Sequence, residues 1–233
     1  MPHLPPTLGM VSKATVSKLV PRVPTRRQQY SATTRRALIE MGEELFTEHG
    51  YAATSLDSIV AGAQVTKGAL YHHFSGKQAL FEAAFERIES DAARDITDSL
   101  QGHDDPWEKA LAGLDRFLEV VRQPAYRRIV ILEGPAVLGY ARFREQSERS
   151  TFATVMDIVG SVLEAGDWDL DEEMVETFTR IFFGAMSSAG ESVSTSDDPE
   201  AAAQRVETAI RFILAGFRAL AEQGAQVGEA SPD

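Results

Sequence analysis

The segment VTKGALYHHFSGK, from Val65 to Lys77, decides the fold of this chain. It is a short stretch with helical spacing that lies between two other helical stretches. Two helices joined by a tight turn form a helix-turn-helix unit, and the helix before them can pack across it. In this arrangement we expect Leu70 and Phe74 to face a small core and the polar residues to face outward. The segment also holds adjacent histidines, His72 and His73, whose role separates several possible functions.

The two histidines do not predict a metal site. The other histidines are His3, His49 and His103, cysteine is absent, and no His-Glu-x-x-His pattern occurs. Adjacent residues on a helix point about 100° apart, so they chelate one ion poorly. Catalysis would need a paired nucleophile or base, and none accompanies them. We therefore predict no metal, no other cofactor and no enzymatic activity. A helical enzyme is the alternative from another class, but a Gly-rich phosphate loop and a Gly-x-Ser-x-Gly elbow are both missing.

Charge is distributed unevenly along the 233 residues, whose formal net charge is -12. Residues 1–77 hold nine Lys/Arg against five Asp/Glu, and the remainder holds 14 against 30. Residues 1–77 are therefore basic and the remainder, which we call the acidic body, is acidic. This asymmetry can indicate a polyanionic partner, although a solvated tail ahead of an ordinary acidic domain is an equal alternative. No apolar run approaches the roughly 18 residues of a membrane helix. We expect a soluble, cytoplasmic protein with no membrane partner.

The periodicity beyond residue 32 predicts an all-α protein of about nine helices. Gly50 should end the first helix, and Thr54 and Ser75 should cap the second and fourth through capping boxes with Asp57 and Gln78. Prolines 106, 124, 135 and 199 should begin later helices. The predicted ranges are 34–49, 54–63, 66–73, 75–100, 106–122, 124–133, 135–165 (broken near 147–150), 171–191 and 199–223. We divide the chain into a disordered basic arm (1–30), a helix-turn-helix domain (31–80), a second helical domain (81–223) and a frayed tail (224–233).

The block LFTEHGYAATSLDSIVAGAQVTKGALYHHFSGKQALFEAAF resembles the DNA-binding domain of TetR-type (TetR/AcrR) transcriptional regulators. The motifs HGY, TSLDSI, VTKGALYHHF and GKQAL follow the family pattern in order over about residues 34–85. One departure is Gln64, which stands in the turn where a glycine is usual, so the turn conformation could differ. The resemblance implies an N-terminal three-helix DNA-binding domain and a C-terminal ligand-binding and dimerisation domain.

The same resemblance implies a homodimeric, sequence-specific regulator of palindromic operator DNA. We expect a repressor that a small apolar or amphipathic ligand releases, the alternative being a constitutive or protein-controlled regulator without a small-molecule effector. Lys67, Gly68 and Tyr71 are expected at base edges, with a core aromatic as the alternative for Tyr71. The expected backbone contacts are Thr54 (alternatively only a cap), Thr66, Ala69, His72 (alternatively a plain surface histidine) and Lys77. His73 is open between a phosphate contact and packing beside Phe74. Further candidates for phosphate or minor-groove contacts are Arg26, Arg27, Arg35 and Arg36, with a solvated disordered tail as an equal alternative for Arg26 and Arg27.

The acidic body has apolar residues on more than one helical stripe, enough for a core and for a second use. A ligand pocket is expected among helices four to eight. Its expected lining residues are Phe85, Trp107, Leu114, Phe117, Ile131, Tyr140, Phe143, Phe152, Met156 and Phe183. For each of them, a place in an ordinary core is the alternative. Glu133, Arg142 and Arg144 could supply polar contacts to the ligand. The alternative is that these three side chains lie on helix faces exposed to solvent. The resemblance implies that the last two helices pair with their copies in a partner, and the alternative is a purely intramolecular core. The expected interface residues are Phe178, Ile181, Ala185, Ile210, Ile213 and Phe217.

Overall fold

A computed structural model describes residues 26–168 and 170–224, and within them the chain is helical with no strand. The all-α prediction is confirmed. The elements in order are α1 (Arg26–Ala53), α2 (Leu56–Gly62), α3 (Lys67–His73), α4 (Lys77–Ser99), α5 (Pro106–Val120), the π-helix η1 (Tyr126–Glu133), α6 (Gly134–Leu138), α7 (Tyr140–Ala165), α8 (Glu172–Thr195) and α9 (Pro199–Glu222).

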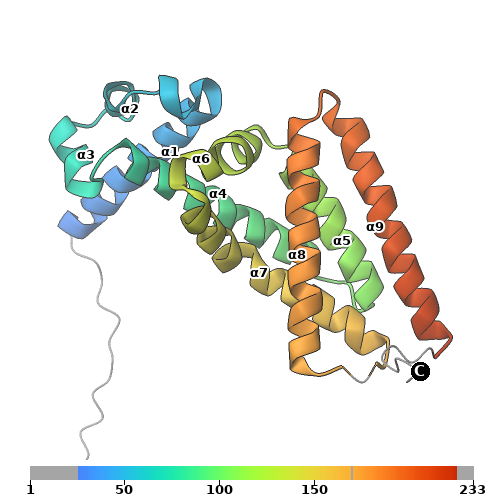
Figure 1. The fold of residues 1–233 in the computed structure, drawn as a ribbon. Coiled ribbons are helices and arrows are strands. Elements are labelled where there is room, and N and C mark those ends of the chain that lie inside the picture. Colours follow the sequence, from blue (N-terminus) through green and yellow to red (C-terminus); the bar gives the residue numbers. More distant parts are fainter. Residues whose placement is uncertain (1–25, 169, 225–233) are drawn as a thin grey trace, which may run out of the picture.

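The helix-turn-helix end and the α8–α9 pair lie at opposite ends of the molecule (Figure 1). Helix α4 starts beside α1 and runs diagonally towards the other end, with α7 packed along it. Helix α5 packs against α4, α7 and α9, while η1 contacts both α1 and α8. This arrangement places α4 and η1 between the two functional ends that we expected from the sequence.

Helix α1 is longer at both ends than predicted. It begins at Arg26, so the predicted disordered arm is wrong for residues 26–30, and the remainder of that arm lies outside the described residues. Gly50 kinks the helix (φ 81°, ψ 167°) rather than ending it, and one more turn follows. A β carbon at Gly50 would lie 2.5 Å from Arg128 Nη2 and 2.6 Å from Glu133 Oε1. Glycine is therefore needed both for the left-handed φ and for the close approach of η1.

Two predicted helix caps are wrong. Ser55, not Thr54, caps α2, and its side chain accepts a 3.0 Å hydrogen bond from the Ser58 main-chain N–H. The N-cap of α4 is Gly76, which makes no side-chain cap, while Gln78 Nε2 donates across the molecule to the Val137 carbonyl at 2.7 Å. At each helix start more than one nearby side chain could accept a hydrogen bond from the first main-chain N–H groups. Packing against distant parts of the chain determines which side chain forms the cap.

The later helices follow the proline signals except around residue 135. Pro135 begins only the short α6, and Gly139 (φ 80°) separates α6 from α7, which starts at Tyr140. Helix α7 then runs through residues 147–150 without the predicted break. The predicted helix 124–133 contains the π-helical segment η1, a wider turn often found at functional sites. α8 extends to Thr195, beyond the predicted end at residue 191.

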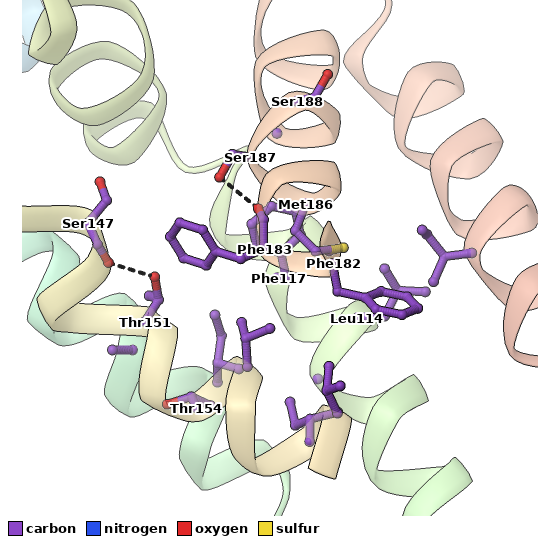
Figure 2. A pocket seen from close by; sticks show the side chains of 18 of the residues that line it. Leu114, Phe117, Ser147, Thr151, Thr154, Phe182, Phe183, Met186, Ser187 and Ser188 are labelled. Carbon is purple, nitrogen blue, oxygen red and sulfur yellow. Dashed lines mark hydrogen bonds between the residues drawn. The ribbon is translucent and has the colours of Figure 1, made fainter. Parts of the chain in front are cut away.

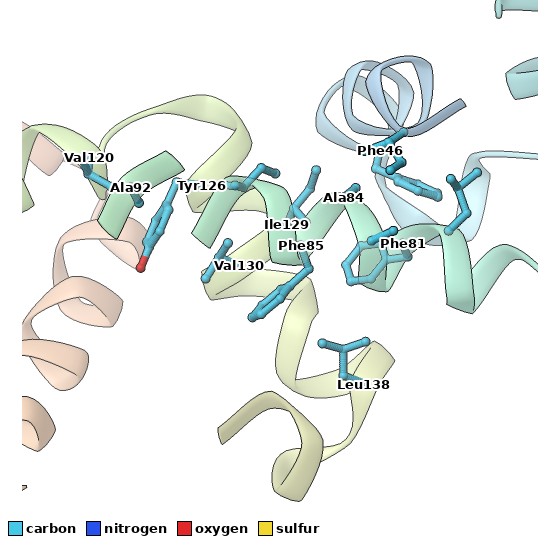
Figure 3. Close-up of a cluster of buried hydrophobic side chains, with 14 of the residues drawn as sticks. Phe46, Phe81, Ala84, Phe85, Ala92, Val120, Tyr126, Ile129, Val130 and Leu138 are labelled. Carbon is cyan, nitrogen blue, oxygen red and sulfur yellow. The ribbon is translucent and has the colours of Figure 1, made fainter. Parts of the chain in front are cut away.

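One apolar core joins the two halves of the chain (Figure 3). It runs from α1–α3 along α4 into η1, with Phe46, Phe81 and Phe85 fully buried. The rings of Phe46 and Phe81 meet edge-on with centroids 5.2 Å apart. Tyr126 and Ile129 of η1 belong to the same cluster, which crosses our proposed boundary at residue 80. A displacement of α4 or η1 therefore reaches the packing of the helix-turn-helix.

Candidate nucleic-acid interface and ligand cavity

The turn between α2 and α3 is built from main-chain bonds and one strained residue. Gln64 has φ 55°, the left-handed conformation that glycine adopts more readily. The Val65 N–H donates to the Val60 carbonyl at 3.1 Å, which closes the turn. Thr66 then caps α3 by accepting from the Ala69 N–H at 3.2 Å. The expected departure at position 64 thus leaves the helix-turn-helix intact.

One face of α3 is anchored and the other is open to solvent. Leu70 is fully buried and Phe74 is buried, as predicted. Tyr71 is 60% exposed, so the alternative of a core aromatic is wrong. Lys67 is exposed, and its Nζ lies 2.8 Å from an oxygen of Asp57 on α2. The nearest atom to a β carbon at Gly68 would be 3.9 Å away, so the helix surface there is open.

Thr66 and His72 are also exposed and Ala69 is half-buried on the same short helix. Together with Lys67, Gly68 and Tyr71 they form the polar surface that we call the α3 face. It offers an ammonium, a phenol, a hydroxyl and an imidazole within seven residues. Such groups can donate to phosphates and to base edges.

Thr54 and Lys77 do not belong to the α3 face. Thr54 is 2% exposed, and its hydroxyl donates to the Gly50 carbonyl at 2.8 Å. Lys77 Nζ donates to the carbonyls of Tyr51 (2.7 Å) and Thr54 (2.9 Å) and lies 4.3 Å from the Tyr51 ring centre. A cation at the C-terminal end of a helix satisfies carbonyls that have no partner within the helix. Both side chains therefore hold the end of α1.

His73 is half-buried between the α3 face and the core. Desolvation, and after it the charges of His72 and Arg35, lower the pKa of His73 from its ordinary value. Its ring lies beside Phe74, with centroids 6.4 Å apart, and the Arg35 guanidinium lies 5.3 Å from the Phe74 ring centre. A neutral, partly packed imidazole fits the structural alternative for His73 better than a phosphate contact.

A cavity of about 510 Å³ lies between α4, α5, η1, α7, α8 and α9 (Figure 2). Its volume falls within the range of small-molecule sites. Six of the ten predicted pocket residues line it, namely Leu114, Phe117, Ile131, Tyr140, Phe143 and Phe183.

Four predicted pocket residues lie elsewhere. Phe85 is fully buried in the main core, where its ring meets Phe143 at 5.8 Å. Trp107 belongs to a second apolar cluster with Leu214. Phe152 packs behind Phe183 at 5.5 Å, and Met156 points to solvent. Aromatic residues at helical spacing predict burial but not which side of the helix meets a cavity.

The three predicted polar handles do not line the cavity. Glu133 accepts from the Tyr51 main-chain N–H and from Arg128 Nε, at 2.8 and 3.1 Å. Arg142 pairs with Glu82, and Arg144 pairs with Glu148. These groups serve contacts between or along helices, so they are unavailable to an occupant.

The polar groups that do line the cavity come mainly from α7 and α8. Ser147, Thr151 and Thr154 lie on one side, and Ser187 and Ser188 on the other (Figure 2). The acidic lining residues are Glu89 and Glu191, and no Lys, Arg or His stands among the described residues that line the space. The sequence interpretation missed Glu89, although the residue interrupts the apolar stripe of α4 between Phe85 and Ala92.

Apolar side chains are exposed on α8 and α9. Ile181 is 62% exposed and Phe212 is 81% exposed, and Met174, Ile213 and Leu220 add to them. Of the predicted interface residues, Ile181, Ala185 and Ile213 lie on this surface. Phe178 and Phe217 instead pack on each other at 6.2 Å, and Ile210 is half-buried at the cavity. Phe212 was missed because it lies one residue off the stripe that we followed.

Two family descriptions match this chain. Residues 38–84 match "Bacterial regulatory proteins, tetR family", and residues 107–217 match "Tetracyclin repressor-like, C-terminal domain". The chain belongs to the TetR family. The resemblance in the helix-turn-helix block is thereby confirmed, and a second match covers the acidic body. The protein is a TetR-family transcriptional regulator with an N-terminal DNA-binding domain.

Individual relatives agree with this assignment. The TetC protein of transposon Tn10 in Escherichia coli is 29% identical over 141 residues, which is 59% of this chain and 70% of TetC. The probable acrEF/envCD operon repressor of E. coli K12 is 31% identical over 115 residues, 45% of this chain. The chain spans 50% of that repressor's length. A TetR-family transcriptional regulator from Pectobacterium atrosepticum has a similar structure, with a TM-score of 0.71 and 27% identity, covering 83% of this chain and 97% of the other.

Two further findings concern metal ligands and membrane-spanning helices. In the part of the chain that the structure describes, His, Asp and Glu side chains form no group of three that could hold a metal ion. A search of the same residues found no helix with both the length and the apolar character needed to span a membrane.

Proposed function

We propose that this TetR-family protein is a homodimeric repressor that binds a palindromic operator and leaves it when a small molecule enters the cavity. The observation that carries the DNA-binding part is the α3 face, which is open to solvent while Leu70 and Phe74 anchor the helix from behind. Acting on DNA, the protein would work in the cytoplasm.

Within the α3 face we assign separate tasks to different side chains. Lys67, Gly68 and Tyr71 read base edges, because they combine a donor, a bulky phenol and a site of close approach. Thr66, Ala69 and His72 contact the sugar-phosphate backbone. The exposed arginines at the start of α1 (Arg26, Arg27, Arg35 and Arg36) would add phosphate contacts.

The exposed apolar surface of α8 and α9 supports a homodimer. A large apolar surface at one end of a monomer is costly in water and marks an interaction site. A twofold arrangement through this surface presents two copies of α3 to the same duplex. Recognition helices about 34 Å apart fit successive major-groove faces of a palindrome.

The cavity supports release by a small molecule over constitutive binding. It lies between the dimer surface and the helix-turn-helix, and α4 and η1 both line it and both pack against α1. An occupant that shifts either element would change the separation of the two α3 helices. A coupling free energy of about 1–3 kcal/mol is enough for regulation.

The experiment that tests the proposal is a titration of the full chain against duplexes from the DNA flanking its gene, followed by fluorescence anisotropy. We expect one palindromic duplex to bind far more tightly than a scrambled duplex, with an affinity that falls steeply as salt rises. Equal affinity for both duplexes at every salt concentration would contradict the proposal.

A further inference from the structure

Glu89 is a buried carboxyl group on the wall of the cavity. It lies on α4, is 2% exposed, and is one of the lining residues. The Tyr126 hydroxyl donates to its Oε1 at 3.3 Å. Oε2 is buried and has no hydrogen-bond partner. Ser150 lies nearby on α7, but its hydroxyl donates to the Gln146 carbonyl at 3.1 Å instead.

An unpartnered carboxylate oxygen in an apolar wall is energetically unfavourable. Burial of a charged group without compensating bonds costs several kcal/mol, so the group tends to take up a proton. Desolvation accordingly raises the pKa of Glu89 to about 7, although the hydrogen bond from Tyr126 acts in the opposite direction. A donor that carries positive charge would satisfy Oε2 and favour the ionised form.

The remainder of the wall also favours a cation over an anion. The other acidic lining residue is Glu191 on α8, and α5 contributes only apolar residues and a glycine to the lining. Tyr126 on η1 and Tyr140 on α7 are the lining phenols. Burial and the neighbouring Glu89 raise the pKa of Tyr126 well above its ordinary value. Among the described lining residues there is no cationic side chain to neutralise a carboxylate or phosphate.

We propose that the effector is an amphipathic amine whose protonated nitrogen donates to Glu89 Oε2 and whose apolar body lies against Phe117, Ile131 and Phe183. The inference rests on the proposed function, because it names the class of effector for the same cavity. Serine and threonine hydroxyls on α7 would accept or donate further bonds to the polar end. Fatty acids and other organic anions are excluded as effectors by this assignment.

The test compares three probes of equal chain length, decylamine, decanol and decanoate, titrated calorimetrically into the full chain at pH 8. We expect decylamine to bind at least about tenfold more tightly than decanol, because a charged hydrogen bond is added. Decanoate should bind more weakly than decanol. At pH 6 decylamine should bind about tenfold more weakly than at pH 8, because Glu89 must first lose a proton while the amine stays charged.

The variant Glu89→Gln should reduce decylamine binding to the level of decanol and leave decanol within about twofold of the unsubstituted protein. Asp98→Asn is the matched control, since it removes one carboxylate from the exposed side of the same helix and should alter none of the three affinities. The inference is overturned if decanoate binds as tightly as decylamine, if the two variants have equal effects, or if no probe binds.

Anisotropy with the operator duplex, measured on the same protein without a probe, separates the two proposals. If the duplex binds but the three probes do not bind in the expected order, the proposal of an amine effector is wrong and the proposed DNA-binding function stands. If the ranking holds and the duplex does not bind, the amine site stands and the proposed function is lost.

Discussion

The main-chain N–H of Tyr51 donates a 2.8 Å hydrogen bond to Oε2 of Glu133, 82 positions away in the sequence. The bond joins the last turn of α1 to the end of η1. The other carboxylate oxygen of Glu133 accepts from Arg128 Nε, and Lys77 holds the neighbouring carbonyls of α1. Because η1 also lines the cavity, this bond connects an element of the cavity wall to the helix-turn-helix.

Glu133→Ala should lower the free energy of unfolding by about 1–3 kcal/mol, the typical loss when a charged hydrogen-bond partner is removed. Amide hydrogen exchange at Tyr51 should accelerate, because its N–H loses its acceptor. Glu148→Ala removes the exposed pair with Arg144 and should cost about 0.5 kcal/mol or less. Equal effects of the two substitutions in urea unfolding would show that the Tyr51–Glu133 bond contributes nothing specific.

Lys77→Ala should weaken binding to every duplex without changing its salt dependence. The ammonium is occupied by the carbonyls of Tyr51 and Thr54, so its loss loosens the end of α1 rather than removing a phosphate contact. Anisotropy titrations over a salt series measure the slope of log Kd against log salt. A phosphate contact would reduce that slope by about 0.9, and such a reduction would restore Lys77 to the DNA interface.

Tyr71→Ala should reduce operator affinity by about 1–3 kcal/mol and reduce the ratio of operator to scrambled-duplex affinity. The side chain is 60% exposed, so stability should change by no more than about 0.5 kcal/mol. Lys67→Ala should behave in the same direction. If both variants kept the full affinity ratio, another part of the α3 face would carry the specificity.

Phe212→Glu should convert the proposed dimer to a monomer in sedimentation velocity and weaken operator binding. The side chain is 81% exposed on the α8–α9 surface, so a charge there disrupts pairing without disturbing the fold. Leu132→Glu is the control, because Leu132 is also exposed but lies on η1. A dimer that persists in Phe212→Glu and dissociates in Leu132→Glu would place the interface elsewhere.

Glu89 should make the empty protein less stable as pH rises from about 4.5 towards 8. Its folded pKa of about 7 lies above the ordinary value of 4.5, so the folded state binds the extra proton between those values. The stability it contributes is therefore complete below pH 4.5 and is lost as pH passes through 7, by an order of 3 kcal/mol. Glu89→Gln should remove this loss in urea unfolding, and it should be more stable than the unsubstituted protein at pH 8. An identical pH profile for both proteins would mean that the carboxyl is not desolvated.

The sequence predicted correctly those features that depend on residues only a few positions apart in the chain. Leu70 and Phe74 lie four residues apart and share one helical face, so spacing alone indicates that both are buried. Proline starts similarly predicted α5 and α9. The motif order in the helix-turn-helix block was sufficient for the family.

The sequence by itself thus determined that the chain is helical, where α3 lies and which of its sides is apolar, because those properties depend on contacts within one or two helical turns. Only the tertiary structure decided that Thr54 and Lys77 close α1, that Glu133 bonds to Tyr51, and that Glu89 faces a cavity. Each of these polar groups could bond to many partners. Which partner it meets depends on how distant helices pack, and that arrangement is set by the whole apolar core.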